Sequence, residues 1–575
     1  MYLLGIHNSA HDAAACVFRD YELVAAVSLE RLKRIKGAGV SAEQELPLPA
    51  IDECLAIAGI TRADIDVVCS TRDLWEYQSY ALQGRLRLKQ QLFRLTGQKR
   101  LPRMCYMMVK LGVHDALDIF DVEGFKARYG FSKAEVYFAN HHFAHGIASY
   151  FYSQFDDALI YTADACGDNV AYSARSARRS ELSLLFGGDE RLYSVFPPHS
   201  VGNLYGIFTQ ALGFIRDRHE GKLTGLAAYG EPKAADELLR HFRITDNGEI
   251  EADFPSHEAM DALARDIAGR LSREDAAASV QHVLETLICG AVGTLLRNTG
   301  LRDAAVAGGA FANVRLNRAL LDQAGAQRVF IFPAMGDEGL PVGACLLYLH
   351  RRDGAATWQR ARRPLTRVDL GRDHDAAFDA ARAAFPTVRR DTEAPVEKAV
   401  EALVAGKVVA IVTGRMEYGP RALGNRSILA SPVRHEINDS INRRLNRSEF
   451  MPFAPVVLES HAAQVFDLHP GNAHAARFMT ITCGVRPEWR ERIAAVVHVD
   501  GSARPQTIGP AENPLYFEIL SRFHARTGLP VLVNTSFNVH EEPIIDTPAQ
   551  ALRALVDNRV DFIVTKDGLY SVGAP

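Results

Sequence analysis

The chain has 575 residues, of which 47% are hydrophobic and 23% charged, and its formal net charge is −4. A chain of this length exceeds what one hydrophobic core usually supports, so we expect at least two domains. The composition is typical of a globular protein, and the weak negative charge argues against a nucleic-acid-binding body.

The cysteines and the N-terminus indicate the compartment. The eight cysteines are scattered and form no CxxC pair, which is typical of reduced thiols. The first residues lack a basic segment followed by a long apolar one, and no uncharged apolar run reaches about 18 residues. We therefore expect a cytoplasmic protein without a membrane span.

Short apolar runs open the chain, and helical and strand patterns then alternate. Residues 2–6, 13–18 and 23–28 predict three antiparallel strands. A first α/β cycle follows, with helices at 51–58 and 144–151 and strands at 66–69, 136–138 and 158–163. A second, similar cycle has a helix at 279–297 and strands at 304–306 and 329–332. The alternation indicates an α/β architecture.

Two basic segments interrupt this order. Residues 73–118 carry basic and aromatic side chains at helical spacing, and they form either a solvated helical hairpin or one wall of an acceptor pocket. Residues 350–366 lose the apolar period and turn basic, which favours an interdomain linker. We place the boundary there, between domains 1–360 and 361–575. The second domain has its own strands at 408–412, 530–533 and 562–564.

Four residues predict a metal site. His141 and His145 stand at the start of a predicted helix, where their spacing puts both imidazoles on one face. Asp164 follows the buried strand 158–163, and Asp337 lies in a glycine-bearing loop. A histidine pair alone is more often structural, but two added carboxylates suit a divalent cation.

Glycine-bearing segments are candidates for phosphate binding. Gly308 and Gly309 follow a strand and lead through Asn313 into a helix, whose N-terminus can face an anion. Lys222 and Gly225 lie in a second such segment, for which an ordinary glycine-punctuated helix is the alternative.

The second domain holds an arginine-rich run at 414–429. Arg415, Arg421 and Arg426 alternate with glycines and a proline, so their planar guanidinium groups suit a phosphoryl or carboxyl-phosphate group better than a solvated surface. Arg504, and the hydroxyls of Thr535 and Ser536, are further candidates because they lie at predicted strand ends.

Taken in order, these runs closely resemble the O-carbamoyltransferases of the NodU/CmcH family. The resemblance spans nearly the whole chain: His11-Asp12, Glu30-Arg31, residues 141–145, Asp164, residues 221–227, Gly308-Gly309, residues 336–339, 414–429, 452–455 and 534–538. It implies a duplicated actin-like/Hsp70-like (ASKHA) domain, as in tRNA threonylcarbamoyl transferases, followed by a YrdC-like α/β domain.

The resemblance also implies a two-step reaction. Carbamoyl phosphate and ATP would form carbamoyladenylate in the YrdC-like domain, and the actin-like domain would move the carbamoyl group to a hydroxyl of a sugar or natural-product acceptor. His141, His145, Asp164 and Asp337 would hold a divalent metal, expected to be Fe(II), and Mg²⁺ could accompany ATP. The remaining family positions would serve catalysis or bind ATP and carbamoyl phosphate: Arg415, Arg421, Arg426, Lys222, Gly225, Gly308, Gly309, Asn313, Gly336, Arg447, Arg504, Thr535, Ser536 and Asn538.

His11 and Asp12 are candidates for proton transfer from the acceptor. His11 lies in a turn between the first two strands and could accept the proton of the acceptor hydroxyl, since imidazole titrates near neutrality. The alternative is a His-Asp pair that stabilises the turn. Relatives carry an arginine where this chain has Met451, so Arg447 or Arg444 would have to replace that phosphate contact.

Two other functions are compatible with an actin-like fold. A small-metabolite kinase would transfer phosphate directly, but it would not need the arginine-rich run or residues 534–538. A Hsp70-like ATP-dependent binding module would need no metal. The sequence indicates neither the acceptor nor the oligomeric state.

Overall fold

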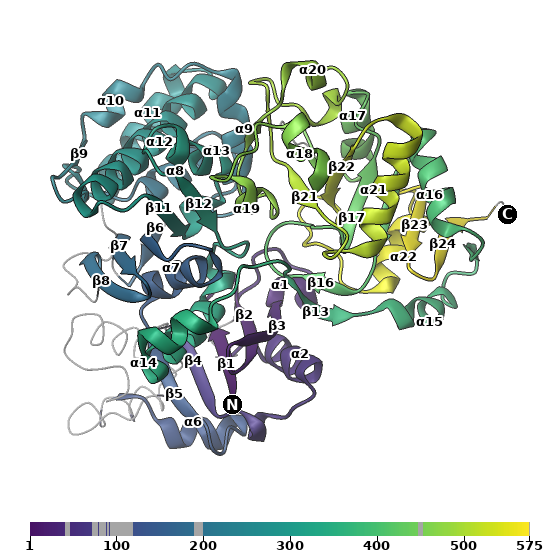
Figure 1. Cartoon of the computed structure of the whole chain (residues 1–575). Helices are drawn as coiled ribbons and strands as arrows, with labels where there is room; N and C mark the ends of the chain where they lie inside the picture. Colours follow the sequence, from purple (N-terminus) through teal and green to yellow (C-terminus); the bar gives the residue numbers. More distant parts are fainter. Residues whose placement is uncertain are drawn as a thin grey trace.

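Figure 1 shows the fold of the chain as a computed structural model. The structure describes residues 1–40, 46–71, 119–168, 170–188, 199–446 and 452–573, together with residues 79, 88 and 91. The basic segment 73–118 therefore lies almost entirely outside the described residues, and neither interpretation of it is tested.

The first sheet follows from the short apolar runs that open the chain. Its strands are β1 (Tyr2–His7), β2 (Ala14–Arg19), β3 (Glu22–Ser28), β4 (Val67–Thr71) and β5 (Glu135–Ala139), in the order β3-β2-β1-β4-β5. β1, β2 and β3 pair in antiparallel fashion, whereas β4 runs parallel to both β1 and β5. The predicted opening of three antiparallel strands is confirmed.

The second sheet repeats this pattern. Its strands are β6 (Asp157–Gly167), β7 (Val170–Arg178), β8 (Glu181–Phe186), β11 (Asp303–Ala307) and β12 (Arg328–Ile331), in the order β8-β7-β6-β11-β12. The first three are again antiparallel, and β11 runs parallel to β6 and β12. The same strand order and directions in both sheets confirm the duplicated α/β domain.

Two helices pack against each other between the sheets (Figure 1). α7 (His141–Tyr152) covers β6 and β11, and α14 (Leu340–Ala361) covers β1 and β4. Glycine permits their close approach, because a Cβ at Gly343 would lie 1.8 Å from the carbonyl oxygen of Ala144. The first turns of both helices are thereby held beside the C-terminal end of β6.

The remaining elements of this half surround the sheets. They are α1 (Leu29–Lys33), α2 (Leu48–Ala58), α6 (Val122–Tyr129), α8 (Val201–Ala211), α9 (Glu220–Leu226), α10 (Ala235–Leu239), β9 (Phe242–Ile244), β10 (Ile250–Ala252), α11 (His257–Arg270), α12 (Arg273–Thr299) and α13 (Val314–Asp322). Within the described part of the chain, α12 alone is long and apolar enough to cross a membrane, and 78% of its apolar window is buried inside the protein, as in a core helix.

The predicted linker is largely helical. α14 continues to Ala361 through a kink at Gly354, whose φ is 74°. Trp358 beyond the kink is fully buried, stacks on Tyr150 and donates from its indole nitrogen to the carbonyl of Leu346. The sequence pattern did not predict this helix because the kink shifts the helical phase. Beyond the kink, the buried indole of Trp358 anchors a turn whose other side chains are mostly basic or polar.

The second half of the chain is built on an eight-stranded mixed sheet in the order β14-β24-β23-β15-β17-β22-β18-β21 (right of Figure 1). Helices α16 (Pro395–Val404) and α21 (Pro514–Thr527) cover one face of this sheet. The elements are β13 (Asp369–Asp373), α15 (Phe378–Arg382), β14 (Val388–Asp391), α16 (Pro395–Val404), β15 (Val409–Val412), β16 (Arg415–Glu417), β17 (Arg426–Ala430), α17 (Glu436–Arg444), β18 (Ala454–Leu458), α18 (Glu459–Val465), α19 (Ala473–Ala476), β19 (Cys483–Gly484), α20 (Pro487–Arg490), β20 (Ser502–Ala503), β21 (Gln506–Ile508), α21 (Pro514–Thr527), β22 (Val531–Ser536), α22 (Pro548–Val556), β23 (Phe562–Thr565) and β24 (Gly568–Val572).

Replacing Gly343 by alanine should destabilise the protein by about 1–3 kcal/mol, because the new methyl group meets the backbone of α7 and the close-packed helices must separate. The matched control is Gly269→Ala in α11, where a Cβ meets no atom within 4 Å and alanine should stabilise by about 0.5–1 kcal/mol. Urea unfolding of both variants measures the two signs, and a neutral Gly343→Ala would contradict the packing described.

Candidate metal centre and interdomain cavity

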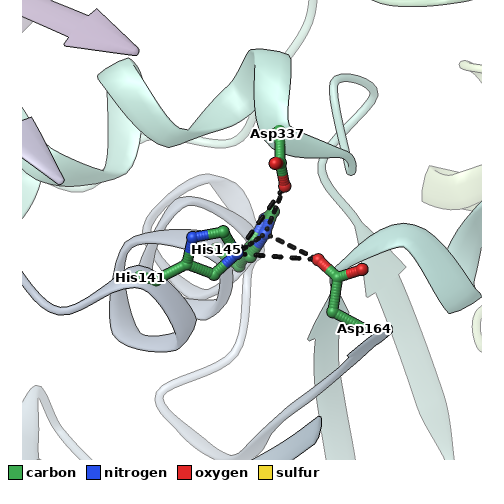
Figure 2. A group of neighbouring side chains, drawn as sticks. All are labelled: His141, His145, Asp164 and Asp337. Atoms are coloured by element: carbon green, nitrogen blue, oxygen red, sulfur yellow. Dashed lines mark hydrogen bonds and ion pairs between the residues drawn. The ribbon is translucent and has the colours of Figure 1, made fainter. Parts of the chain in front are cut away.

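Four side chains from three separate stretches of chain converge at one point (Figure 2). His145 Nε2 lies 3.1 Å from His141 Nε2, 3.3 Å from Asp164 Oδ2 and 3.2 Å from Asp337 Oδ1. His141 Nε2 lies 3.6 Å from the same oxygens of both aspartates. One ligand atom from each residue falls within 4.8 Å of all the others. The structure thus brings together the whole predicted metal set.

Local backbone features hold the two imidazoles in place. Asn140 caps α7 by accepting from the backbone N–H of Phe143, so the helix begins at His141. Asp168 accepts from the backbone N–H of His141 at 2.7 Å. Gly167 lies directly against the His141 ring, where a Cβ would come within 2.1 Å of it. Any larger residue at position 167 would therefore displace the first imidazole.

The two carboxylates of this cluster favour a bound cation. Burial by itself lowers the pKa of His145, but hydrogen bonds to Asp164 and Asp337 outweigh it and raise that pKa to about 9. Burial acts to raise the pKa of Asp164, yet the bonds from His141 and His145 hold it below its usual range. Without a metal, the proton on His145 offsets part of the charge of the two half-buried carboxylates. Two imidazoles and two carboxylates are donors that divalent first-row metals accept, so the residues fit such an ion.

His142 lies beside the two ligands in sequence but is turned away from them. Its ring nitrogens lie 2.8 Å from Thr162 Oγ1 and 2.9 Å from the carbonyl oxygen of Val170. Burial, followed by the charge of His141, lowers the pKa of His142 to about 3, so this ring is neutral and part of the core.

His7 is a site residue that sequence reasoning missed. It ends β1, is fully buried, and its Nε2 lies 3.5 Å from Asp337 Oδ2. It therefore contacts the carboxylate oxygen that faces away from the metal ligands. The available signal was a polar residue closing an otherwise apolar strand.

His11 lies at the rim of the same cluster. Its Nδ1 is 3.2 Å from Asp12 Oδ2 and 3.8 Å from Asp337 Oδ2, and its side chain is 60% exposed. The hydrogen bond to Asp12 raises the pKa of His11 to about 9, against the opposing effect of burial. At neutral pH the ring is therefore protonated, and it must first lose that proton before it can act as a base.

A cavity of about 580 Å³ connects the metal cluster with the second half of the chain. Asp164 is part of its wall. The other predicted site residues that line it are Asp12, Lys222, Gly309, Asn313, Gly336, Arg421, Arg504, Thr535, Ser536 and Asn538. It also contains Glu30 and Glu338, and burial followed by the charges of Asp12 and Glu30 raises the pKa of Glu338 to about 8. The first half thus contributes carboxylates near the metal cluster together with cations such as Lys222, and the second half contributes Arg421 and Arg504.

Two predicted catalytic arginines lie outside this wall. Arg415 donates to the backbone carbonyls of Val24, Leu370 and Gly371. Arg426 is fully buried and donates to several backbone carbonyls of its own loop and to that of Asp546. The prediction that these two arginines contact phosphate is therefore corrected. Their guanidinium groups donate instead to backbone carbonyl oxygens, which would otherwise lack donors.

Other predicted phosphate ligands also have structural roles. Gly308 has a φ of 103° and leaves no space for a side chain, because a Cβ would lie 2.3 Å from the carbonyl oxygen of Ala163. Gly225 is buried within α9, outside the cavity wall. Asn313 lines the cavity but caps α13 with its side-chain oxygen. Arg444 pairs with Asp561, so it does not replace an arginine at Met451. Arg447 and Met451 lie outside the described residues.

Hydrogen bonds join the two halves of the chain beside the cavity. His219 Nε2, at the start of α9, lies 2.7 Å from Glu541 Oε1 of the second half. Arg34 donates to the carbonyls of Pro543 and Ile544 in the same loop, and Arg31 donates to that of Gly419. Sequence reasoning named Arg31 only as part of a family motif and did not predict these contacts, because the bonded partners are more than 300 positions apart.

Metal binding should release a proton and weaken in acid. Because His145 has a pKa of about 9 when no metal is bound, a metal must displace its proton, and apparent affinity should fall about tenfold per pH unit as pH decreases below that value. Calorimetric titration with Co²⁺ at several pH values measures the slope. His145→Ala should weaken Co²⁺ affinity by more than the roughly 10- to 100-fold that is typical when a residue behind a metal ligand is replaced.

The control for that titration is His142→Gln, which changes the neighbouring buried histidine and should still bind one equivalent of Co²⁺. Affinity that is independent of pH, or equal loss in both variants, would contradict the site.

Comparisons with known proteins identify the family of this chain. Residues 2–346 match the family described as carbamoyltransferase N-terminus, and residues 400–571 match carbamoyltransferase C-terminus. Nodulation protein NolNO of Sinorhizobium fredii is 31% identical over 96% of this chain and 78% of its own length. Nodulation protein NolO of Bradyrhizobium diazoefficiens is 31% identical over 74% of this chain and 77% of its own. Among solved structures, the match with full-length HypF spans 62% of this chain and 56% of HypF, with 12% sequence identity and a TM-score of 0.33. The family matches span both halves of the molecule, and the chain belongs to the carbamoyltransferase family.

Proposed function

We propose that this carbamoyltransferase is ATP-dependent and transfers the carbamoyl group of carbamoyl phosphate to a hydroxyl of a sugar or another small natural product. One observation carries the proposal. A single cavity between the two halves contains Asp164 of the metal cluster and also Arg421, Arg504 and Ser536. An activated carbamoyl group formed at the arginines could therefore reach the metal cluster within one cavity.

Formation of the activated group is assigned to the second half, residues 361–575, as a YrdC-like domain. Water would convert carbamoyl phosphate to carbamate and phosphate, and a carbamate oxygen would attack the α-phosphorus of ATP, giving carbamoyladenylate and releasing pyrophosphate. Arg421 and Arg504 would offset the charge that accumulates as these anions meet. The Ser536 hydroxyl, which donates to Asn538 Oδ1 at 2.6 Å, would turn to a phosphate oxygen; Thr535 lines the same cavity, and Lys222 would supply a cation from the first half.

Transfer to the acceptor is assigned to residues 1–360. The acceptor oxygen would attack the carbamoyl carbon, AMP would leave, and the acceptor proton would pass to a base. His141, His145, Asp164 and Asp337 would hold a divalent metal, which we propose is Fe(II) and which would supply a Lewis acid for the carbamoyl oxygen; Mg²⁺ would accompany ATP. The acidic wall of Asp12, Glu30 and Glu338 suits hydrogen bonding to a hydroxylated acceptor. A cytoplasmic location, where ATP is available, remains a prediction.

The direct test combines the protein with ATP, carbamoyl phosphate and a panel of hydroxylated acceptors. Pyrophosphate should form, and one acceptor should gain about 43 Da, the mass change for replacing a hydroxyl hydrogen by a carbamoyl group. Arg504→Ala should abolish pyrophosphate release, whereas His145→Ala should retain it and lose transfer. A phosphorylated acceptor would show a kinase instead, and loss of pyrophosphate release in His145→Ala would contradict the division of labour.

The role of His11 is tested by the pH dependence of transfer. If His11 accepts the acceptor proton, the rate should rise with pH and level off near the pKa of about 9, because only the neutral ring is a base. Asp12→Asn removes the bond that raises this pKa and should move the rise to lower pH. His11→Ala should abolish transfer and leave pyrophosphate release intact. If His11→Ala still transfers carbamoyl groups, the His-Asp pair only stabilises the turn.

A further inference from the structure

The side chain of Asn534 ends in a buried acceptor oxygen for which the described residues supply no donor. It lies in the centre of β22, between β17 and β18, and it lines the interdomain cavity while remaining 99% buried. Its Nδ2 donates to the carbonyl oxygen of Ala422 at 3.2 Å and to Gln506 Oε1 at 2.7 Å. Within the described part of the chain, its Oδ1 has no hydrogen-bond partner.

The orientation of this amide is fixed by a chain of hydrogen bonds. Gln506 donates from Nε2 to the carbonyl oxygen of Leu423 at 2.8 Å, so its Oε1 must face Asn534. Backbone carbonyls only accept, and two of them anchor the chain at Ala422 and Leu423. Rotating the Asn534 amide by half a turn would place its oxygen against two acceptors. The group left over is therefore an acceptor and not a donor.

The position of this oxygen relates it to the candidate phosphate residues. Ala422 directly follows Arg421, and Gln506 lies two residues after Arg504. Ser536 is two residues further along β22, so its side chain points to the same face of the sheet as Asn534. The unpaired oxygen thus lies among the segments that carry Arg421, Arg504 and Ser536.

We infer that Asn534 selects the donor substrate by accepting a hydrogen bond from the carbamoyl NH₂ group. The inference depends on the proposed function. Phosphate groups ionised at neutral pH offer no N–H donor, whereas the amine of carbamoyl phosphate is separated from its phosphorus only by the carbonyl carbon and the bridging oxygen. Acetyl phosphate has the same shape but carries a methyl group there, which would leave the buried oxygen unsatisfied. A site built around such a bond rejects the analogue that lacks it.

Pyrophosphate release from ATP with each acyl phosphate tests this selection. Wild-type protein should prefer carbamoyl phosphate to acetyl phosphate in kcat/KM by at least about 100-fold. Asn534→Leu keeps the side-chain size and removes the acceptor, so the ratio should fall to within about tenfold of unity while KM for ATP is unchanged. A folded Asn534→Leu that retains the wild-type ratio would overturn the inference. So would a change confined to discrimination between ATP and 2′-deoxyATP, because Asn534 would then contact the ribose.

The matched control is Asn438→Leu. Asn438 is also a buried asparagine of the second half, with Nδ2 donating to the carbonyl of Ala495 at 2.8 Å and Oδ1 unpaired, but it lies in α17, outside the described cavity wall. It should lose stability to a similar extent and keep the wild-type selectivity. Equal loss of selectivity in both variants would overturn the inference, because it would trace selectivity to general loosening of the domain.

A measurement on the wild-type protein covers the case in which Asn534→Leu does not fold. Phosphonoacetamide carries the amine, and phosphonoacetone carries a methyl group in the same place. Calorimetry should show the amide binding at least about tenfold more tightly, and equal affinities would overturn the inference. Because this measurement needs no turnover, it also separates the two ideas: absent pyrophosphate release with selective amide binding would reject the proposed reaction and not the role of Asn534.

Discussion

The attraction between two half-buried carboxylates and two buried imidazoles is the interaction on which the rest of this structure depends. Asp164 and Asp337 face each other across His145, and a positive partner offsets the cost of withdrawing both anions from water. The arrangement joins the end of β6, the first turn of α7 and the loop before α14. The close packing of α7 on α14 is then more than core formation, since it fixes the distance between the two sources of carboxylate.

A second constraint acts between the halves of the chain. Arg31, Arg34 and Arg415 each donate to backbone carbonyls of the opposite half, and His219 contacts Glu541. These bonds hold Arg421 and Arg504 of the second half across the cavity from Asp164 and the other lining residues of the first half. Arginine suits this work because its charge persists at all relevant pH and its fork can reach two carbonyls at once.

The arginine-rich run shows how one sequence pattern can contain two kinds of residue. Arg421 faces the cavity, whereas Arg415 and Arg426, only a few positions away, support the backbone. Arg426 keeps its loop folded around the start of β17, and that loop leads to Arg421. The structural arginines therefore act indirectly on the same site. The polar chain from Leu423 through Gln506 to Asn534 performs a similar task in the neighbouring strands.

The sequence by itself determined the duplicated α/β fold, the metal set and several cavity residues. Strand and helix periodicity is local, and the four-residue spacing of His141 and His145 is set by helix geometry. Asp164 lies near the C-terminal end of β6, and Asp337 lies in the loop between β12 and α14. Only the tertiary structure decided what depends on distant partners. Arg415, Arg421 and Arg426 look alike in sequence, but Arg415 donates to the distant carbonyl of Val24, and Arg426 donates both to carbonyls of its own loop and to that of Asp546. His7 and Asn534 gained their roles in the same way, because burial and the direction of a side chain are set by residues far along the chain.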